Sequence, residues 1–173
     1  MASNPYAAPE SDVSHFSDEV IQTTPFTKKG RLSLASFLAH SMVLTLISLA
    51  LIAGLAFVDS IITGNSFGLE SIAAPGQFLL VGIGIIYLGM FYVAICQIIK
   101  RLHDVNFNGW WVLAVLLVVG LILLFIPGQE TPNRFGAWRK TRVWEKIFAA
   151  LYVLFFVASI AVSIVAPMAA FSS

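Results

Sequence analysis

The stretch LSLASFLAHSMVLTLISLALIAGLAFV, residues 32–58, decides the fold class. It contains no Asp, Glu, Lys or Arg. Because about 20 apolar residues cross the ~30 Å hydrocarbon core of a bilayer as a helix, this stretch is long enough to span a membrane. Three further apolar stretches follow it, at residues 77–99, 110–126 and 144–166. The sequence therefore predicts an all-α integral membrane protein, a small bundle of four hydrophobic membrane segments.

The composition of the chain supports a membrane class. Hydrophobic residues make up 58% of the chain and charged residues 11%, against averages of about 45–50% and about 25% in soluble domains. The net charge of +1 gives no global field for nucleic acid. The run Arg139, Lys140, Arg142 is too short for a nucleic-acid patch, so we expect no nucleic-acid partner.

The N-terminal region differs from the rest of the chain. Residues 1–27 are acidic and rich in Pro, Ser and Thr, a composition typical of a flexible, disordered tail. Residues 28–173 are expected to form one membrane domain.

The distribution of Lys and Arg leaves the topology open. Three of them precede the first segment, none follow it, two follow the second, and five lie between the third segment and the start of the fourth. With four crossings each side of the membrane receives five. We expect both termini in the cytoplasm, because the first basic flank usually dominates. If residues 110–126 instead enter and leave on one side, all ten charges lie on that side. The uninterrupted apolar length of this segment favours a crossing.

Three polar motifs flank the apolar segments. They are GRLS at residues 30–33, KRLHDVNFNGWW at 100–111, and PG at 127–128 followed by NRFG at 133–136. Together they resemble the YhaH/YhaI-like family of small bacterial inner-membrane proteins, a domain-of-unknown-function family. The resemblance implies a multi-pass protein of the bacterial inner (cytoplasmic) membrane and no particular activity. Leu34 and Asn108 depart from the family pattern, and segment 144–166 adds a helix to it.

The central motif has an anchoring interpretation. Arg101 and Asp104 are three residues apart and can pair on a helix. The Asn108-Gly109 dipeptide favours a turn, and Trp residues are enriched at the headgroup level of membranes. The alternative is a site for a lipid headgroup or another ligand. Its candidate residues are Arg101, His103, Asp104, Asn108, Trp110, Trp111, Asn133 and Arg134.

A metal site is not expected. His103-Asp104 supplies two adjacent candidate ligands, whereas zinc usually takes three or four protein ligands. The other histidines lie at positions 15 and 40, far from this motif in the sequence. We therefore predict no metal and no cofactor.

Two polar residues lie within the apolar segments, His40 and Gln97. An ionisable residue inside a membrane segment is by default a functional candidate. His40 also has a packing interpretation, because Ser36 is one helical turn away.

The sequence favours an accessory or scaffold protein that binds lipid headgroups, including anionic lipids, or other membrane proteins, including a second copy of itself. A small transporter or channel is the alternative, although pores usually need polar residues along several helices. A membrane enzyme using the Arg-Leu-His-Asp motif comes third, so the sequence leans against catalysis.

Overall fold

The computed structural model describes residues 26–64, 67–68, 75–117 and 125–172. Within these ranges the chain is helical, with one isolated antiparallel bridge between Asn133 and Gly136. The predicted tail falls almost entirely on residues 1–25, outside the described ranges. The elements are α1 (Leu34–Thr63), α3 (Gln77–Asp104), the 3-10 turn η2 (Gly109–Trp111), α4 (Val112–Leu116) and α6 (Val143–Ser172).

Three of these helices are long and apolar enough to cross a membrane. They are Leu34–Thr63, Gln77–Asp104 and, within α6, Val143–Val165, with mean hydropathies of 2.4, 2.4 and 2.6. At 1.5 Å per residue, even the shortest reaches about 35 Å, more than the ~30 Å hydrocarbon core. The protein therefore fits the membrane class, and three of the four predicted segments are helices of spanning length.

The segment 110–126 is different. Its helical part, η2 and α4, ends at Leu116, and residues 118–124 lie outside the described ranges. Both of its ends lie at the C-terminal end of α3. Phe107 N, just before the segment, donates to Leu102 O at 2.9 Å, and Ile126 O, at its far end, accepts from Arg101 Nη2. The described ends of this segment therefore lie at one end of the molecule, and its described part contains no helix of spanning length.

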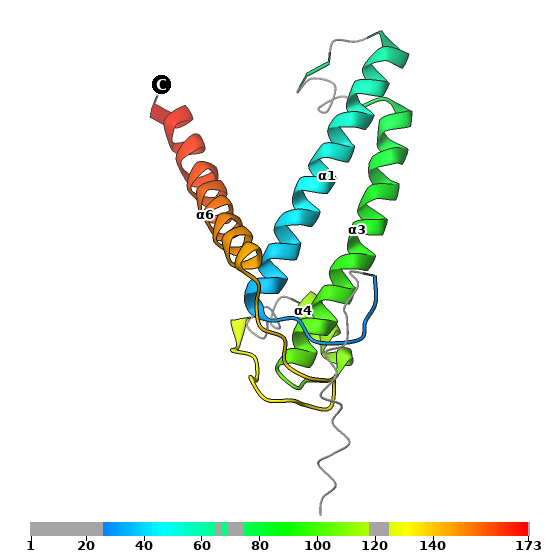
Figure 1. Cartoon of the computed structure of the whole chain (residues 1–173). Coiled ribbons are helices and arrows are strands. Elements are labelled where there is room, and N and C mark those ends of the chain that lie inside the picture. The colour runs from blue at the N-terminus through cyan, green and yellow to red at the C-terminus, as the bar shows by residue number, and fades with distance from the viewer. Residues whose placement is uncertain (1–25, 65–66, 69–74, 118–124, 173) are drawn as a thin grey trace, which may run out of the picture.

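The long helices form an open arrangement (Figure 1). Helices α1 and α3 run antiparallel side by side, and α6 packs against the start of α1 and then diverges from it. Because α1 and α6 begin at the same end, the basic flank of α1 and the C-terminal end of α6 lie at opposite ends. Both termini on one side of the membrane would require an even number of crossings, whereas three helices of the described chain are of spanning length.

Helix ends are set by local polar contacts. Ser33 caps α1 by accepting a hydrogen bond from Ser36 N at 3.3 Å. Gly64, with φ +71°, ends the same helix in the left-handed conformation that glycine tolerates best. At this end Asp59 accepts a hydrogen bond from Gly76 N at 3.3 Å, which ties α1 to the start of α3.

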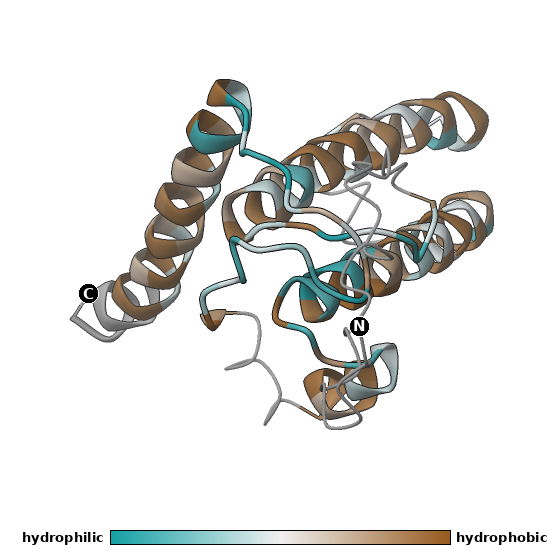
Figure 2. Cartoon of the chain, turned by 60° about the horizontal axis from the view of Figure 1, so that its bottom comes forward, coloured by the Kyte–Doolittle hydropathy of each residue, from teal (hydrophilic) through white to brown (hydrophobic). Residues whose placement is uncertain are grey.

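Polar residues mark two levels along the α1–α3 pair. On α1, His40 and Asp59 are about 29 Å apart by helical rise, and on α3, Gln77 and Gln97 are about 30 Å apart. Both spacings match the ~30 Å hydrocarbon core. Beyond the level of His40 and Gln97, on the side away from Asp59 and Gln77, lies what we call the basic end. It consists of residues 28–39, 98–111 and 125–146. Figure 2 shows hydrophilic residues gathered in the loops of this end and hydrophobic residues along the helices.

Candidate functional site

Asp104, the last residue of α3, holds two arginines at the basic end. Its Oδ2 lies 2.7 Å from Arg101 Nη1, and its Oδ1 lies 3.1 Å from Arg31 Nη2. The three side chains are buried, with Arg101 0% exposed. Buried charges are stable only when paired and hydrogen-bonded. This triad therefore joins the start of α1 to the end of α3.

The remaining guanidinium donors bind backbone carbonyls of the loop that follows segment 110–126. Arg31 Nη1 donates to Thr131 O at 2.7 Å, and Arg31 Nη2 also donates to Gln129 O. Arg101 Nη2 donates to Ile126 O. Each nitrogen of the Arg31 guanidinium thus has an acceptor within the protein. The triad fixes the course of the loop, and its arginines are not free to bind a ligand.

The Pro127-Gly128 pair lets the loop approach the triad closely. A Cβ atom on Gly128 would overlap the Asp104 carboxylate, so no larger residue fits without movement. The next residue, Gln129, donates its N–H to Asp104 O at 3.0 Å. This close approach explains why a glycine stands at position 128.

The third motif packs on the second. The ring of Phe135 stacks on that of His103, with centroids 3.8 Å apart, and Asn133 Nδ2 donates to His103 O at 2.9 Å. Arg134 lies over Phe135 and donates to Asn106 O at 2.9 Å. His103 Nδ1 is 3.3 Å from Gly30 O of the first motif. All three motifs therefore meet in one cluster.

A second polar cluster joins α6 to α1, and the sequence analysis missed it. Glu145 is 1% exposed and lies 2.5 Å from Arg139 Nη2, which also donates to Ser36 Oγ at 3.2 Å. The other Glu145 oxygen accepts from Arg142 N at 2.7 Å and so caps the first turn of α6. Its signal in the sequence was an acidic residue in the first turn of an apolar helix, at the third residue of α6.

The structure divides the candidate residues into two groups. The cluster brings together Arg101, His103, Asp104, Asn133 and Arg134. Three others stay on the surface beside it: Asn108 precedes η2, Trp110 is 77% exposed and Trp111 is 47% exposed. Trp111 packs edge-on against Phe107 at 5.4 Å. Exposed tryptophans at this level suit the membrane–water interface.

The two polar residues of the apolar segments line one cavity. His40 Nδ1 is 2.6 Å from Ser36 O, one turn back, and its ring is 5.7 Å from Trp144. Gln97 is 2% exposed, and its Nε2 has no hydrogen-bond partner in the part of the chain that the structure describes. Both side chains line a cavity of about 400 Å³ between α1 and α3.

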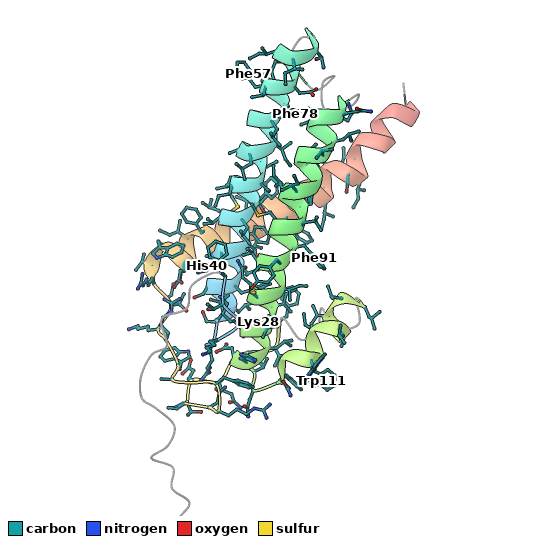
Figure 3. All side chains as sticks on the ribbon, turned by 90° about the vertical axis from the view of Figure 1, so that its right-hand side faces the viewer. Lys28, His40, Phe57, Phe78, Phe91 and Trp111 are labelled. Carbon is teal, nitrogen blue, oxygen red and sulfur yellow. The ribbon has the colours of Figure 1, made fainter. Side chains whose placement is uncertain are left out.

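Exposed positive charge surrounds the buried clusters of this end. Within the described ranges, no three His, Cys, Asp or Glu side chains come together to hold a metal ion. Six basic side chains are exposed around the buried clusters: Lys28, Lys29, Arg134, Lys140, Arg142 and Lys146. Figure 3 shows Lys28 on the face of α1 and α3 below His40 and Phe91.

These features define a small α-helical protein of the membrane class, in which three motifs close one end of a helix pair. The chain belongs to the DUF805 family, described as "Protein of unknown function (DUF805)", which matches residues 25–137. The match includes α1, α3 and the whole motif cluster and ends before α6. It agrees with the expected membership of a family of unknown function. No curated protein and no solved structure matches the chain.

Proposed function

We propose that this protein is a multi-pass protein of the bacterial cytoplasmic membrane that binds anionic phospholipid headgroups at its basic end, as a small accessory or scaffold protein. One observation carries the proposal: all ten Lys and Arg residues of the chain belong to the basic end. The contacts of Arg31 with Asp104, of Arg134 with Asn106 and of Arg139 with Ser36 bring the three basic stretches together there.

The orientation follows from this distribution. Short loops rich in Lys and Arg stay in the cytoplasm. With residues 110–126 returning to the basic end, the ten-to-none division replaces the five-to-five tie of four crossings. The basic flank of α1 then faces the cytoplasm, and the C-terminal end of α6 faces the opposite side.

The exposed basic residues, and not the buried motif, are the proposed headgroup ligands. Arg31 and Arg101 are engaged with Asp104 and with loop carbonyls. The six exposed cations keep their charge at the surface, where each Lys or Arg attracts an anionic bilayer by about 1 kcal/mol. The buried triad holds the three stretches in one place, so that their charges act together.

The test measures lipid preference directly. The purified full chain is placed in nanodiscs of phosphatidylglycerol mixed with phosphatidylcholine, and lipids that remain bound after detergent transfer are counted by native mass spectrometry. We expect enrichment of phosphatidylglycerol that weakens as salt rises, because the Debye length shortens from about 10 Å at 0.1 M to about 3 Å at 1 M.

Matched variants assign that preference to charge. The triple variant Lys140→Gln, Arg142→Gln, Lys146→Gln removes three exposed charges and should lose most of the enrichment, whereas Lys140→Arg, Arg142→Lys, Lys146→Arg keeps them and should retain it. Equal retention of the two lipids by the unaltered chain would refute headgroup binding.

A further inference from the structure

The cavity between α1 and α3 has the extent of one membrane leaflet. On α1 its lining runs from His40 to Leu51, and on α3 from Gln97 to Ile85. These spans are about 17 Å and 18 Å by helical rise. Half of the ~30 Å hydrocarbon core is about 15 Å. The cavity therefore runs from the polar level at His40 and Gln97 to about the middle of the bilayer.

The cavity is apolar except at its basic-end mouth. Aliphatic side chains and Met90 line its length, and Gly89 leaves it open, since a Cβ at that position would meet no atom within 4 Å. Gln97 lies at the mouth, buried, with an amide nitrogen that lacks a partner in the described chain. A buried donor without an acceptor costs free energy, so the site favours an occupant that brings an acceptor to Gln97.

The mouth of the cavity also carries positive charge. Phe26 lines the cavity, and its carbonyl accepts a hydrogen bond from Tyr92 Oη at 3.2 Å. Lys28 and Lys29 follow within three residues and are exposed. Because each residue spans at most about 3.6 Å, their Cα atoms lie within about 11 Å of that of Phe26.

We propose that this cavity binds one acyl chain of an anionic diacyl phospholipid of the basic-end leaflet, with an ester carbonyl accepting a hydrogen bond from Gln97 Nε2 and the phosphate beside Lys28 and Lys29. The order of groups along the site, two cations, then an amide donor, then an apolar channel one leaflet deep, matches the order phosphate, ester and acyl chain. The inference rests on the proposed orientation and adds a specific tail site to headgroup binding.

A larger side chain inside the cavity tests whether an acyl chain occupies it. In Gly89→Leu the new side chain occupies the channel, whereas in the matched control Gly84→Leu it enters open space on α3 away from the cavity lining. Native mass spectrometry of the full chain with diacyl phosphatidylglycerol should show roughly tenfold weaker retention of one tightly bound lipid in Gly89→Leu, a change of the size that one lost buried contact gives. Gly84→Leu should retain it.

Replacing the ester linkage of the lipid tests the proposed hydrogen bond from Gln97 without altering the protein. The unaltered chain should prefer diacyl phosphatidylglycerol over its dialkyl ether analogue by roughly three- to tenfold, the scale of one hydrogen bond. Gln97→Leu should bind the two lipids equally. A general loss of phosphatidylglycerol preference would indicate failure of headgroup binding. The acyl-chain site would be overturned if that preference were unchanged and Gly89→Leu and Gly84→Leu retained the lipid equally. Displacement of the lipid by an added isoprenoid quinone would also overturn it.

Discussion

At the scale of the residue, Asp104 joins two buried arginines at the protein's basic end. One carboxylate serves two buried guanidinium groups, and its backbone oxygen accepts from Gln129 N. Removing one partner of a buried ion pair leaves an uncompensated charge, at a cost of about 3–5 kcal/mol. Asp104 therefore stabilises the folded protein, and its replacement should destabilise the whole cluster.

We predict that Asp104→Asn strongly destabilises the folded protein, because Arg31 and Arg101 would share a neutral amide. The midpoint of thermal unfolding, followed in detergent by fluorescence-detected size exclusion, should fall, with a loss of about 3–5 kcal/mol. Glu130→Gln is the control, since Glu130 is exposed at the same end. Equal midpoints for the two variants would show that the triad does not hold the cluster together.

Gly128 gives a second prediction at this scale. In Gly128→Ala the added methyl would overlap the Asp104 carboxylate, so either the loop or the ion pair has to move. We expect a lower unfolding midpoint and greater protease cleavage between residues 127 and 142. Gly84→Ala, whose methyl meets open space, should be neutral or stabilising by up to about 1 kcal/mol. A Gly128→Ala protein as stable as Gly84→Ala would contradict the close approach.

Residue-level contacts were foreseeable only where they are local. The spacing of Arg101 and Asp104 predicted their pairing, and the structure has it at 2.7 Å. The contact of Arg31 with Asp104 joins residues 73 apart in the sequence, and hydropathy carries no information about it. The packing interpretation of His40 relied on Ser36 one turn back, and His40 Nδ1 lies 2.6 Å from the Ser36 carbonyl oxygen.

At the scale of the element, three of the four predicted segments became long helices because apolar length alone specifies them. Residues 32–58, 77–99 and 144–166 correspond to α1, α3 and α6. Residues 110–126 have the same apolar character, yet polar motifs flank them on both sides and bind each other. Hydropathy describes each segment by itself. The path that a segment takes depends also on the contacts made by the residues that flank it.

Helix α6 depends on its N-terminal contacts, because it diverges from α1 beyond its first turns (Figure 1). We predict that Glu145→Ala weakens the attachment of α6, since it removes both the cap at Arg142 N and the partner of Arg139. The loss of the cap alone is worth about 1 kcal/mol. Thermal unfolding and hydrogen exchange of residues 143–157 report the change.

Two variants make that prediction sharper. Lys146→Ala, at an exposed position of the same turn, should leave exchange unchanged. Glu145→Gln keeps an oxygen acceptor for Arg142 N and should have an intermediate effect. If Glu145→Ala matched Lys146→Ala in both measurements, the buried carboxylate would not anchor α6.

At the scale of the whole molecule, all ten Lys and Arg residues lie at the basic end. The sequence left a tie between two orientations with four crossings and a third arrangement with every Lys and Arg on one side. Local physics favoured the crossing, because 17 apolar residues reach about 26 Å. The contacts of Arg101 with Ile126 and of Arg134 with Asn106 instead support the third arrangement. Such contacts depend on the path of the whole chain, which the hydropathy of a single segment does not describe.

The accessibility of single cysteines tests this arrangement most directly. In a Cys96→Ser background, one cysteine is placed at Asn106, Thr131 or Thr63, and intact spheroplasts receive an impermeant maleimide. Asn106 and Thr131 belong to the basic end, and Thr63 ends α1 at the opposite end. We predict labelling at position 63 alone before lysis, and at all three positions after it. Labelling at 131 but not at 106 in intact cells would place these loops on opposite sides of the membrane and contradict the account.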